Sequence, residues 1–242
     1  MSMMRKESPN QMNDIASRIL YEDNHLIIIN KRCGELVQGD ETGDRTLADD
    51  VKQYLKDMYH KEGNVYLGIP HRLDRPTSGI VIYTKTEKAL IRMNEEFKGS
   101  GVKKTYWAIV DKEPEKSEAM LVHYIIRDPK TNKSIALPVE RQEAKIAKLD
   151  YRLIAKGERY FLLEIHLHTG RHHQIRAQLA AIGIHVKGDL KYGAARSNPD
   201  GGICLHARSV TFTHPVKKEE ITITADPPHD NLWEALMQAK TE

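Results

Sequence analysis

The sequence has few of the features that mark secreted, membrane-spanning or zinc-binding proteins. Cys33 and Cys204 are its only cysteines, which is too few for a disulfide framework, and they lack the paired spacing of a zinc site. No apolar run approaches the length needed to span a bilayer, and residues 1–18 contain no apolar core of a signal peptide. We therefore expect a cytoplasmic protein with no membrane partner and no metal.

Glycine-rich phosphate loops and clusters of metal ligands are also missing, so we expect no cofactor. The formal net charge is only +3, a value that permits nucleic acid as a partner without arguing for it. Residues 166–196 are more informative, because they contain five Lys or Arg, five His and a single acid, Asp189. This segment could face phosphates or form a solvated basic face, and composition alone favours the second interpretation.

The apolar content is sufficient for a folded core, since 40% of the 242 residues are hydrophobic. We expect one large domain over 19–242, preceded by a flexible segment over 1–18. Alternating or β-branched apolar runs predict a hairpin at 19–30 and strands at 79–86, 103–111, 160–168, 208–215 and 219–228. Residues 112–150 are rich in charge, and hairpins and loops are expected there.

Helical periodicity predicts four helices. One covers 46–59 with Thr46 as N-cap and Asp49 at the third helical position, and a second follows Thr86. A third is expected from 170 to 183 and a short one at 230–240. Strands outnumber helices and do not alternate regularly with them, so the predicted fold class is α+β, with a mixed, largely antiparallel sheet flanked by helices and loops.

The stretch HRLDRPTSG, residues 71–79, gathers cationic side chains around one aspartate, Asp74. An aspartate in a turn is usually a local hydrogen-bonding residue, but this one lies in a loop before a strand, where catalytic groups often sit. Arg176, in the predicted helix from 170, is a candidate partner. At about 4 Å and an effective dielectric constant of about 20, such a pair is worth roughly 4 kcal/mol. A paired Asp74 would stay ionised and be a candidate nucleophile or base.

Five motifs then share one resemblance. HRLDRPTSG resembles the H-R-L-D-x-x-T-S-G signature of the RluA-type pseudouridine synthases, and in family order YEDNHLIIINK resembles their opening hairpin. KTYWAIV carries their K-x-Y, HTGRHHQIRAQL resembles their T-G-R-x-H-Q-I-R-x-H-L, and GDLKYG with LHARSVTFTHP is similar to their closing elements. The resemblance runs from about residue 21 to 228 and implies that family's catalytic fold, with a central cleft.

The resemblance also implies roles for individual residues. Asp74 would be the essential catalytic carboxylate and Arg176 its ion-pair partner, while Tyr106 would stack on the target base and help to remove the proton from C5. Leu205 would line the base pocket, and Arg72 would enter the space left by the flipped nucleotide. The remaining residues assigned to substrate binding are His71, Arg75, Arg171 and His173.

For Tyr106, Leu205 and His173, the sequence without the resemblance supports a structural role at least as well as a functional one. Tyr106 fits an ordinary strand tyrosine packed in the core, Leu205 a core leucine, and His173 a residue that caps or packs the start of the helix. Their functional assignment depends mostly on the resemblance.

The implied reaction is an isomerisation of uridine in ribosomal or transfer RNA. The C1′–N1 bond breaks and a C1′–C5 bond forms, without redox change or external energy, after the nucleotide is flipped out. Asp74 would either attack C1′, as carboxylates do in retaining glycosidases, or remove a proton from C2′ to give a glycal. The sequence leaves both open.

Two departures from the family pattern affect the expectations. Asn30-Lys31-Arg32-Cys33-Gly34 stands where N-K-P-x-G is usual, so a rigidifying proline is lost. The segment before residue 21 is too short for the S4-type RNA-binding domain of some relatives, so we expect target selection by the catalytic domain, acting as a monomer. Two rivals are weighed: a non-catalytic RNA-binding or RNA-folding protein on the same fold, and a nucleosidase acting on small molecules.

Overall fold

A computed structural model describes residues 14–99 and 101–239 of the protein, and one large sheet organises it. The strands are β1 (Ile19–Glu22), β2 (Leu26–Lys31), β3 (Ser78–Thr84), β4 (Lys103–Val110), β5 (Glu118–Asp128), β6 (Lys133–Leu137), β7 (Lys145–Lys156), β8 (Phe161–Leu167), β9 (Leu205–Thr213) and β10 (Glu220–Thr224). Their order is β1-β2-β3-β9-β4-β8-β7-β5-β6, and β10 pairs with β9. Among the strands of the described residues, β3 and β9 alone pair in parallel, which confirms the predicted mixed, largely antiparallel α+β fold.

The helices are α2 (Leu47–Met58), α3 (Glu87–Lys98), α4 (Gln174–Ala181) and α5 (Asn231–Gln238). The predicted capping box of α2 is present, because the Thr46 side chain accepts from the Asp49 amide and the Asp49 carboxylate accepts from the Thr46 amide. Thr86 caps α3 through the Ala89 amide, also as predicted. Local sequence signals therefore located these two helix starts correctly.

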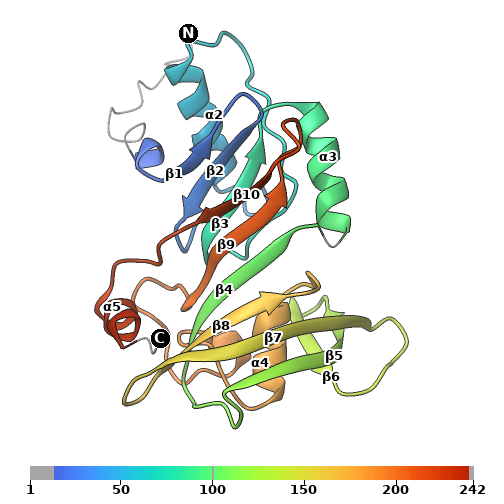
Figure 1. The fold of residues 1–242 in the computed structure, drawn as a ribbon, viewed down its shortest axis with the longest axis vertical. Helices are drawn as coiled ribbons and strands as arrows, with labels where there is room; N and C mark the ends of the chain where they lie inside the picture. Colours follow the sequence, from blue (N-terminus) through green and yellow to red (C-terminus); the bar gives the residue numbers. More distant parts are fainter. Residues whose placement is uncertain (1–13, 100, 240–242) are drawn as a thin grey trace.

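Among the four apolar clusters of the described residues, the two largest are called the first and the second core. They lie in the two halves of the elongated molecule, whose ribbon is drawn in Figure 1. The first packs α2 against β2 and β3, through residues such as Leu55, Ile29 and Val81. The second packs α4 against β4 and β8, through residues such as Leu179 and Ile165. Strand β4 crosses from one half to the other (Figure 1). The junction between the two cores is therefore built around this strand.

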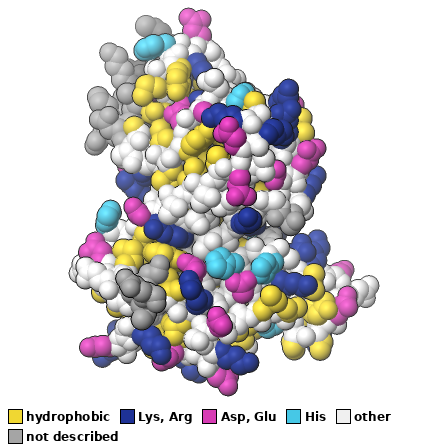
Figure 2. All heavy atoms as spheres, in the orientation of Figure 1, with side chains coloured by type: hydrophobic (Ala, Val, Ile, Leu, Met, Phe, Trp, Pro, Cys, Tyr) yellow, Lys and Arg dark blue, Asp and Glu magenta, His cyan; other side chains and the backbone are white. Residues whose placement is uncertain are grey.

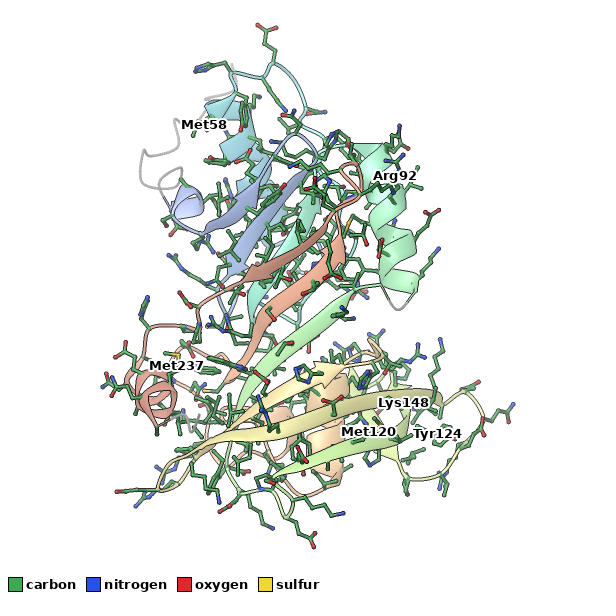
Figure 3. All side chains as sticks on the ribbon, viewed as in Figure 1. Met58, Arg92, Met120, Tyr124, Lys148 and Met237 are labelled. Carbon is green, nitrogen blue, oxygen red and sulfur yellow. The ribbon has the colours of Figure 1, made fainter. Side chains whose placement is uncertain are left out.

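The second half of the sheet carries α4 on one face only. Met120, Tyr124 and Lys148 lie on the opposite face, which is turned to the viewer in Figure 3, and Met120 is among the exposed apolar side chains. Elsewhere on this face α5 covers β4 through Trp233 and Trp107. No helix within the described residues is long and apolar enough to cross a membrane.

The structure corrects one expectation about a helix and confirms another about hairpins. The helix expected from residue 170 begins only at Gln174, because His173 has a left-handed backbone with φ 50°. His172 therefore lies outside the helix. The hairpins and loops expected in 112–150 are present, because β5 pairs antiparallel with β6 and with β7, and loops connect these strands.

The N-terminal segment is described only from residue 14. Ile15 is buried in the first core, and Arg18 pairs with Asp14 and Glu35 at 2.8 Å each. Residues 14–18 are thus attached to the first strand. The flexibility predicted for 1–18 stays a prediction for residues 1–13, which lie outside the described residues.

Candidate active site

A buried lysine forms hydrogen bonds to the loop that carries Asp74. Lys31, only 1% exposed, donates from Nζ to the carbonyls of Arg32, Asp74, Arg75 and Thr77 at 3.0, 3.3, 3.0 and 2.7 Å. Burial lowers the pKa of Lys31 to about 8. Because three of the four carbonyls belong to the 74–77 turn, this one ammonium group determines the path of that backbone.

The glycine that closes the loop is needed for a close approach between strands. Gly79 has φ 112° and pairs with Ala207 of β9. A Cβ at this position would collide with the Ala207 backbone. Only glycine therefore lets β3 leave the loop and pair directly with β9.

Asp74 and Arg176, separated by about a hundred residues in the chain, meet as predicted. Arg176 Nη1 donates to Asp74 Oδ2 at 3.1 Å. The other side of the guanidinium binds Asp189, with Nε to Oδ2 at 2.6 Å and Nη2 to Oδ1 at 2.8 Å. Burial alone would lower the pKa of Arg176, but the hydrogen bonds and charge of Asp189, followed by those of Asp74, raise it. Arg176 thus stays charged and its plane is fixed.

His173 also faces Oδ2 of Asp74, and the other ring nitrogen of His173 contacts Tyr192. The Tyr192 hydroxyl accepts from the Ser134 amide at 2.7 Å and lies 2.9 Å from His173 Nδ1. The Tyr192 hydroxyl can donate its proton to Nδ1, and in that tautomer the imidazole proton is on Nε2, 3.5 Å from Asp74 Oδ2. Burial, and secondly Arg176, lowers the pKa of His173 to about 2. His173 thus faces Asp74 as a neutral imidazole.

Asp74, His173 and Arg176 line a cleft with a volume of about 980 Å³. Tyr106 on β4 packs against both apolar cores and also lines the cleft, and Leu205 on β9 contributes to its wall. Burial raises the pKa of the Tyr106 phenol, and the charge of Asp74 adds to the effect. The cleft therefore opens where the two halves of the sheet meet, with an aromatic and an aliphatic side chain beside Asp74.

The other residues assigned to the substrate from the sequence have different environments. Arg72 and Arg171 line the cleft; Arg72 is exposed and Arg171 Nε donates to the Ile146 carbonyl at 2.9 Å. His71 also lines it, but its Nε2 accepts from the Ile82 amide at 2.9 Å and its ring stacks on Phe97. His71 therefore fastens the loop to β3 as well.

Arg75 is not brought to the cleft. Its Nε donates to the Gly34 carbonyl at 3.0 Å and its Nη1 lies 3.0 Å from Asp44 Oδ2. The side chain lies outside the cleft lining. Its assignment to the substrate stays a prediction, and nearness in sequence to Asp74 does not determine which way the turn directs each side chain.

The 166–196 segment does not form one basic face. Arg176 is buried on Asp189, Lys187 binds Asn198 and Lys191 binds the Asn132 carbonyl. His166 and His168 do line the cleft and share Asp150, at 2.9 and 2.5 Å. Histidine and basic side chains gather across the middle of the face in Figure 2.

Sequence reasoning missed Asp189, Tyr192 and Lys31 as parts of the site. Asp189 had a usable signal, since it is the single acid in a strongly basic segment, and a buried arginine requires a carboxylate. Tyr192 lies within GDLKYG and Lys31 at the lysine of the N-K-P-x-G pattern, but these motifs do not indicate that Tyr192 contacts His173 or that Lys31 binds the 74–77 turn. Among the described residues, no three His, Cys, Asp or Glu side chains are grouped to hold a metal ion.

The arrangement leaves one carboxylate oxygen available for chemistry. Both contacts of the Asp74 side chain go to Oδ2, and within the described residues no donor reaches Oδ1. The side chain is 30% exposed, against 5% for Arg176. An ionised carboxylate held on one oxygen and open on the other can attack an electrophilic carbon or remove a proton in the cleft.

Comparison with known proteins identifies similar sequences. The family model described as RNA pseudouridylate synthase matches residues 25–181. An uncharacterized RNA pseudouridine synthase of Synechocystis sp. is 33% identical, covering 87% of this chain and 65% of that protein. The tRNA pseudouridine synthase C of Haemophilus influenzae is 32% identical, covering 90% of this chain and 95% of that protein. The chain spans 65 to 72% of the length of the first relatives that it matches.

The fold also has counterparts among solved structures. The structure of human RNA pseudouridylate synthase domain containing 4 superposes with a TM-score of 0.77, covering 94% of both chains at 22% identity. At this identity the similarity concerns the fold alone. It confirms the expected catalytic fold, in which a large sheet carries the cleft.

Proposed function

This chain belongs to the RNA pseudouridylate synthase family, and from that membership we propose that it converts specific uridines in RNA to pseudouridine at the cleft around Asp74. The observation that carries the proposal is the carboxylate of Asp74, held on Oδ2 by Arg176 at 3.1 Å and open on Oδ1 toward the cleft. Over residues 19–242 we treat the chain as one catalytic domain.

The proposed chemistry needs only groups that the cleft supplies. The C1′–N1 bond of uridine breaks, the uracil turns, and a C1′–C5 bond forms while C5 loses a proton and N1 gains one. Asp74 either attacks C1′ and is displaced when the C1′–C5 bond forms, or removes a proton from C2′ and later returns it, so one carboxylate serves both routes. Arg176 and the neutral His173 hold that carboxylate in place by facing its Oδ2. The reaction is an isomerisation, so it needs no external oxidant or reductant.

Tyr106 and Leu205 are proposed to hold the flipped uracil. Tyr106 lies in the cleft with a raised phenol pKa, which keeps its hydroxyl protonated at neutral pH. An aromatic ring stacks on any base, and a neutral hydroxyl can exchange a proton at C5. Arg72, exposed at the cleft, is proposed to fill the space that the nucleotide leaves.

The RNA is proposed to be ribosomal or transfer RNA. The name of the Haemophilus relative supports transfer RNA, and the resemblance of the motifs allows either. Unpaired loops are the expected context because their bases cost least to extrude. We further propose that the protein acts as a monomer in the cytoplasm.

A purely RNA-binding protein is the less favoured alternative. A carboxylate beside RNA phosphates costs binding energy and serves no purpose without chemistry. A nucleosidase acting on free nucleosides is also disfavoured, because the cationic side chains at the cleft suit a polyanionic strand better.

The test is release of tritium from RNA labelled at C5 of uridine. The wild-type protein should release tritium from bulk ribosomal or transfer RNA, and Asp74→Ala should release none while still binding RNA. Asp150→Ala is the matched control, because Asp150 lines the same cleft but bonds only to His166 and His168; it should stay active. Full activity in Asp74→Ala would refute the mechanism, and release from free uridine would favour the nucleosidase.

A further inference from the structure

Lys104 projects into the cleft beside the proposed catalytic residues. It precedes Tyr106 by two positions on β4, so both side chains lie on the same face of the strand. Lys104, Tyr106 and Asp74 line the same cleft. The Lys104 side chain is half-buried there.

Within residues 14–99 and 101–239, Lys104 has no carboxylate or hydrogen-bonding partner. Its Nζ lies 5.9 Å from the centroid of the Phe97 ring, and a Cβ placed at Gly170 would lie 3.3 Å from it. Burial lowers the pKa of Lys104, and no acidic group opposes this effect. The neighbouring His71 is neutral, with its pKa lowered to about 3 by burial and secondly by Lys104.

The two carboxylates of the cleft are both engaged elsewhere. Asp74 contacts Arg176 and His173, and Asp150 contacts His166 and His168. Other buried cations have full sets of partners: Lys31 has four carbonyls and Lys85 has Glu22 at 2.8 Å. Desolvation of a half-buried ammonium group without a counter-ion costs free energy, so a bound anion would stabilise it.

We propose that Lys104 binds a backbone phosphate of the nucleotide whose base enters the cleft beside Tyr106. This inference rests on the proposed function, because the base and ribose of uridine are neutral and the phosphodiester is the one anionic group that the nucleotide brings. Arg176 cannot take this role, since both sides of its guanidinium are committed to carboxylates. A compact ammonium suits a single phosphate oxygen as a point charge.

The first measurement is binding of a fluorescently labelled oligouridylate over a range of KCl concentrations. Lys104→Met keeps the length and the contact with Phe97 but removes the charge. It should lower affinity about tenfold and reduce the slope of log affinity against log salt by about 0.7, the value for one contact with a single strand. Lys104→Arg should retain most of the affinity.

Lys156→Met is the matched control. It removes the same charge from a side chain that lies outside the cleft lining, is 62% exposed and lies 2.6 Å from Glu113. Its effect on affinity and slope should be several times smaller, because exposed pairs contribute little. Equal effects of the two variants would show a general charge effect and overturn the proposal.

A neutral backbone separates phosphate recognition from contact with the base. On an oligouridylate with methylphosphonate linkages, wild type and Lys104→Met should bind equally weakly. If the tenfold difference persists on that RNA, Lys104 contacts base or ribose and the proposal fails. The melting temperature of each variant monitors folding.

Catalysis gives a separate readout. With saturating RNA, Lys104→Met should keep the wild-type kcat in tritium release while KM rises about tenfold. A fall in kcat at unchanged KM would overturn the binding role. If the wild type binds RNA but releases no tritium, the proposed function fails, whereas the binding comparison still decides the role of Lys104.

Discussion

Asp189→Asn is the substitution that tests most directly how the site is held together. Asp189 is 1% exposed and forms two hydrogen bonds to the Arg176 guanidinium, at 2.6 and 2.8 Å. The asparagine keeps the shape and one acceptor but removes the charge that neutralises a buried cation. Arg176 would then depend on Asp74, whose side chain is 30% exposed.

The expected magnitude follows from the burial of the pair. Removing one partner of a buried ion pair costs about 3 to 5 kcal/mol, and the remaining contact with Asp74 places this case near about 3 kcal/mol. For a chain of this size, about 3 kcal/mol lowers the melting temperature by roughly 6 to 12 °C. The single-turnover rate should also fall strongly. A displacement of about 1 Å in a positioned group costs on the order of a hundredfold in rate.

The assay is thermal unfolding together with single-turnover tritium release at a temperature where both proteins are folded. Asp111→Asn is the matched control, since Asp111 pairs with His185 at 2.9 Å but is 32% exposed; its melting temperature should change by less than about 2 °C. The reasoning is refuted if Asp189→Asn has the wild-type melting temperature and rate, because Arg176 would then need no second carboxylate.

Three further predictions concern groups that act on the site from a distance. Lys31→Met removes the ammonium donor from the 74–77 turn, so that within the described residues the Asp74 carbonyl keeps only the Thr77 amide as a donor; kcat and melting temperature should both fall, and unchanged amide hydrogen exchange across residues 74–77 would contradict the clamp. Tyr192→Phe removes the hydroxyl that contacts His173 Nδ1, and should lower the single-turnover rate about tenfold at unchanged RNA affinity; an equal rate would exclude the contact from the mechanism. Burial lowers the pKa of His206 from 6.5 to about 4, so the unfolded state binds the proton first and stability falls by about 1.4 kcal/mol per pH unit as pH drops from about 6.5 to about 4. Urea denaturation of His206→Gln should show a flatter dependence on pH, and an unchanged slope would argue against a buried neutral imidazole.

Local signals predicted the parts of the fold that depend on neighbours in the chain. The N-cap of α2 at Thr46 and that of α3 at Thr86 were both predicted, because a cap is made with residues two or three positions away. The helix expected from 170 was placed too early because its apolar periodicity does not reveal a left-handed residue. His173 adopts that conformation where its ring reaches Tyr192 and Asp74.

Sequence also limited which residues could carry the chemistry. The spacing within HRLDRPTSG and the four later motifs singled out Asp74, Tyr106 and Arg176 as candidates, and all three line the cleft. Arg75 does not line the cleft, because its side chain turns away to Asp44. Motifs specify residue types in order, but the direction of each side chain depends on the turn and on what packs around it.

By itself, then, the sequence determined the family, the fold class and the identity of the candidate carboxylate, since these depend on local patterns and on motifs in order. Only the tertiary structure decided what holds that carboxylate: Lys31 beneath its loop, Asp189 behind Arg176, and Tyr192 behind His173. It also revealed that Lys104 lines the cleft without a counter-ion among the residues that the structure describes. The physical reason is that charge pairing and desolvation depend on distances between strands and helices that are far apart in the chain.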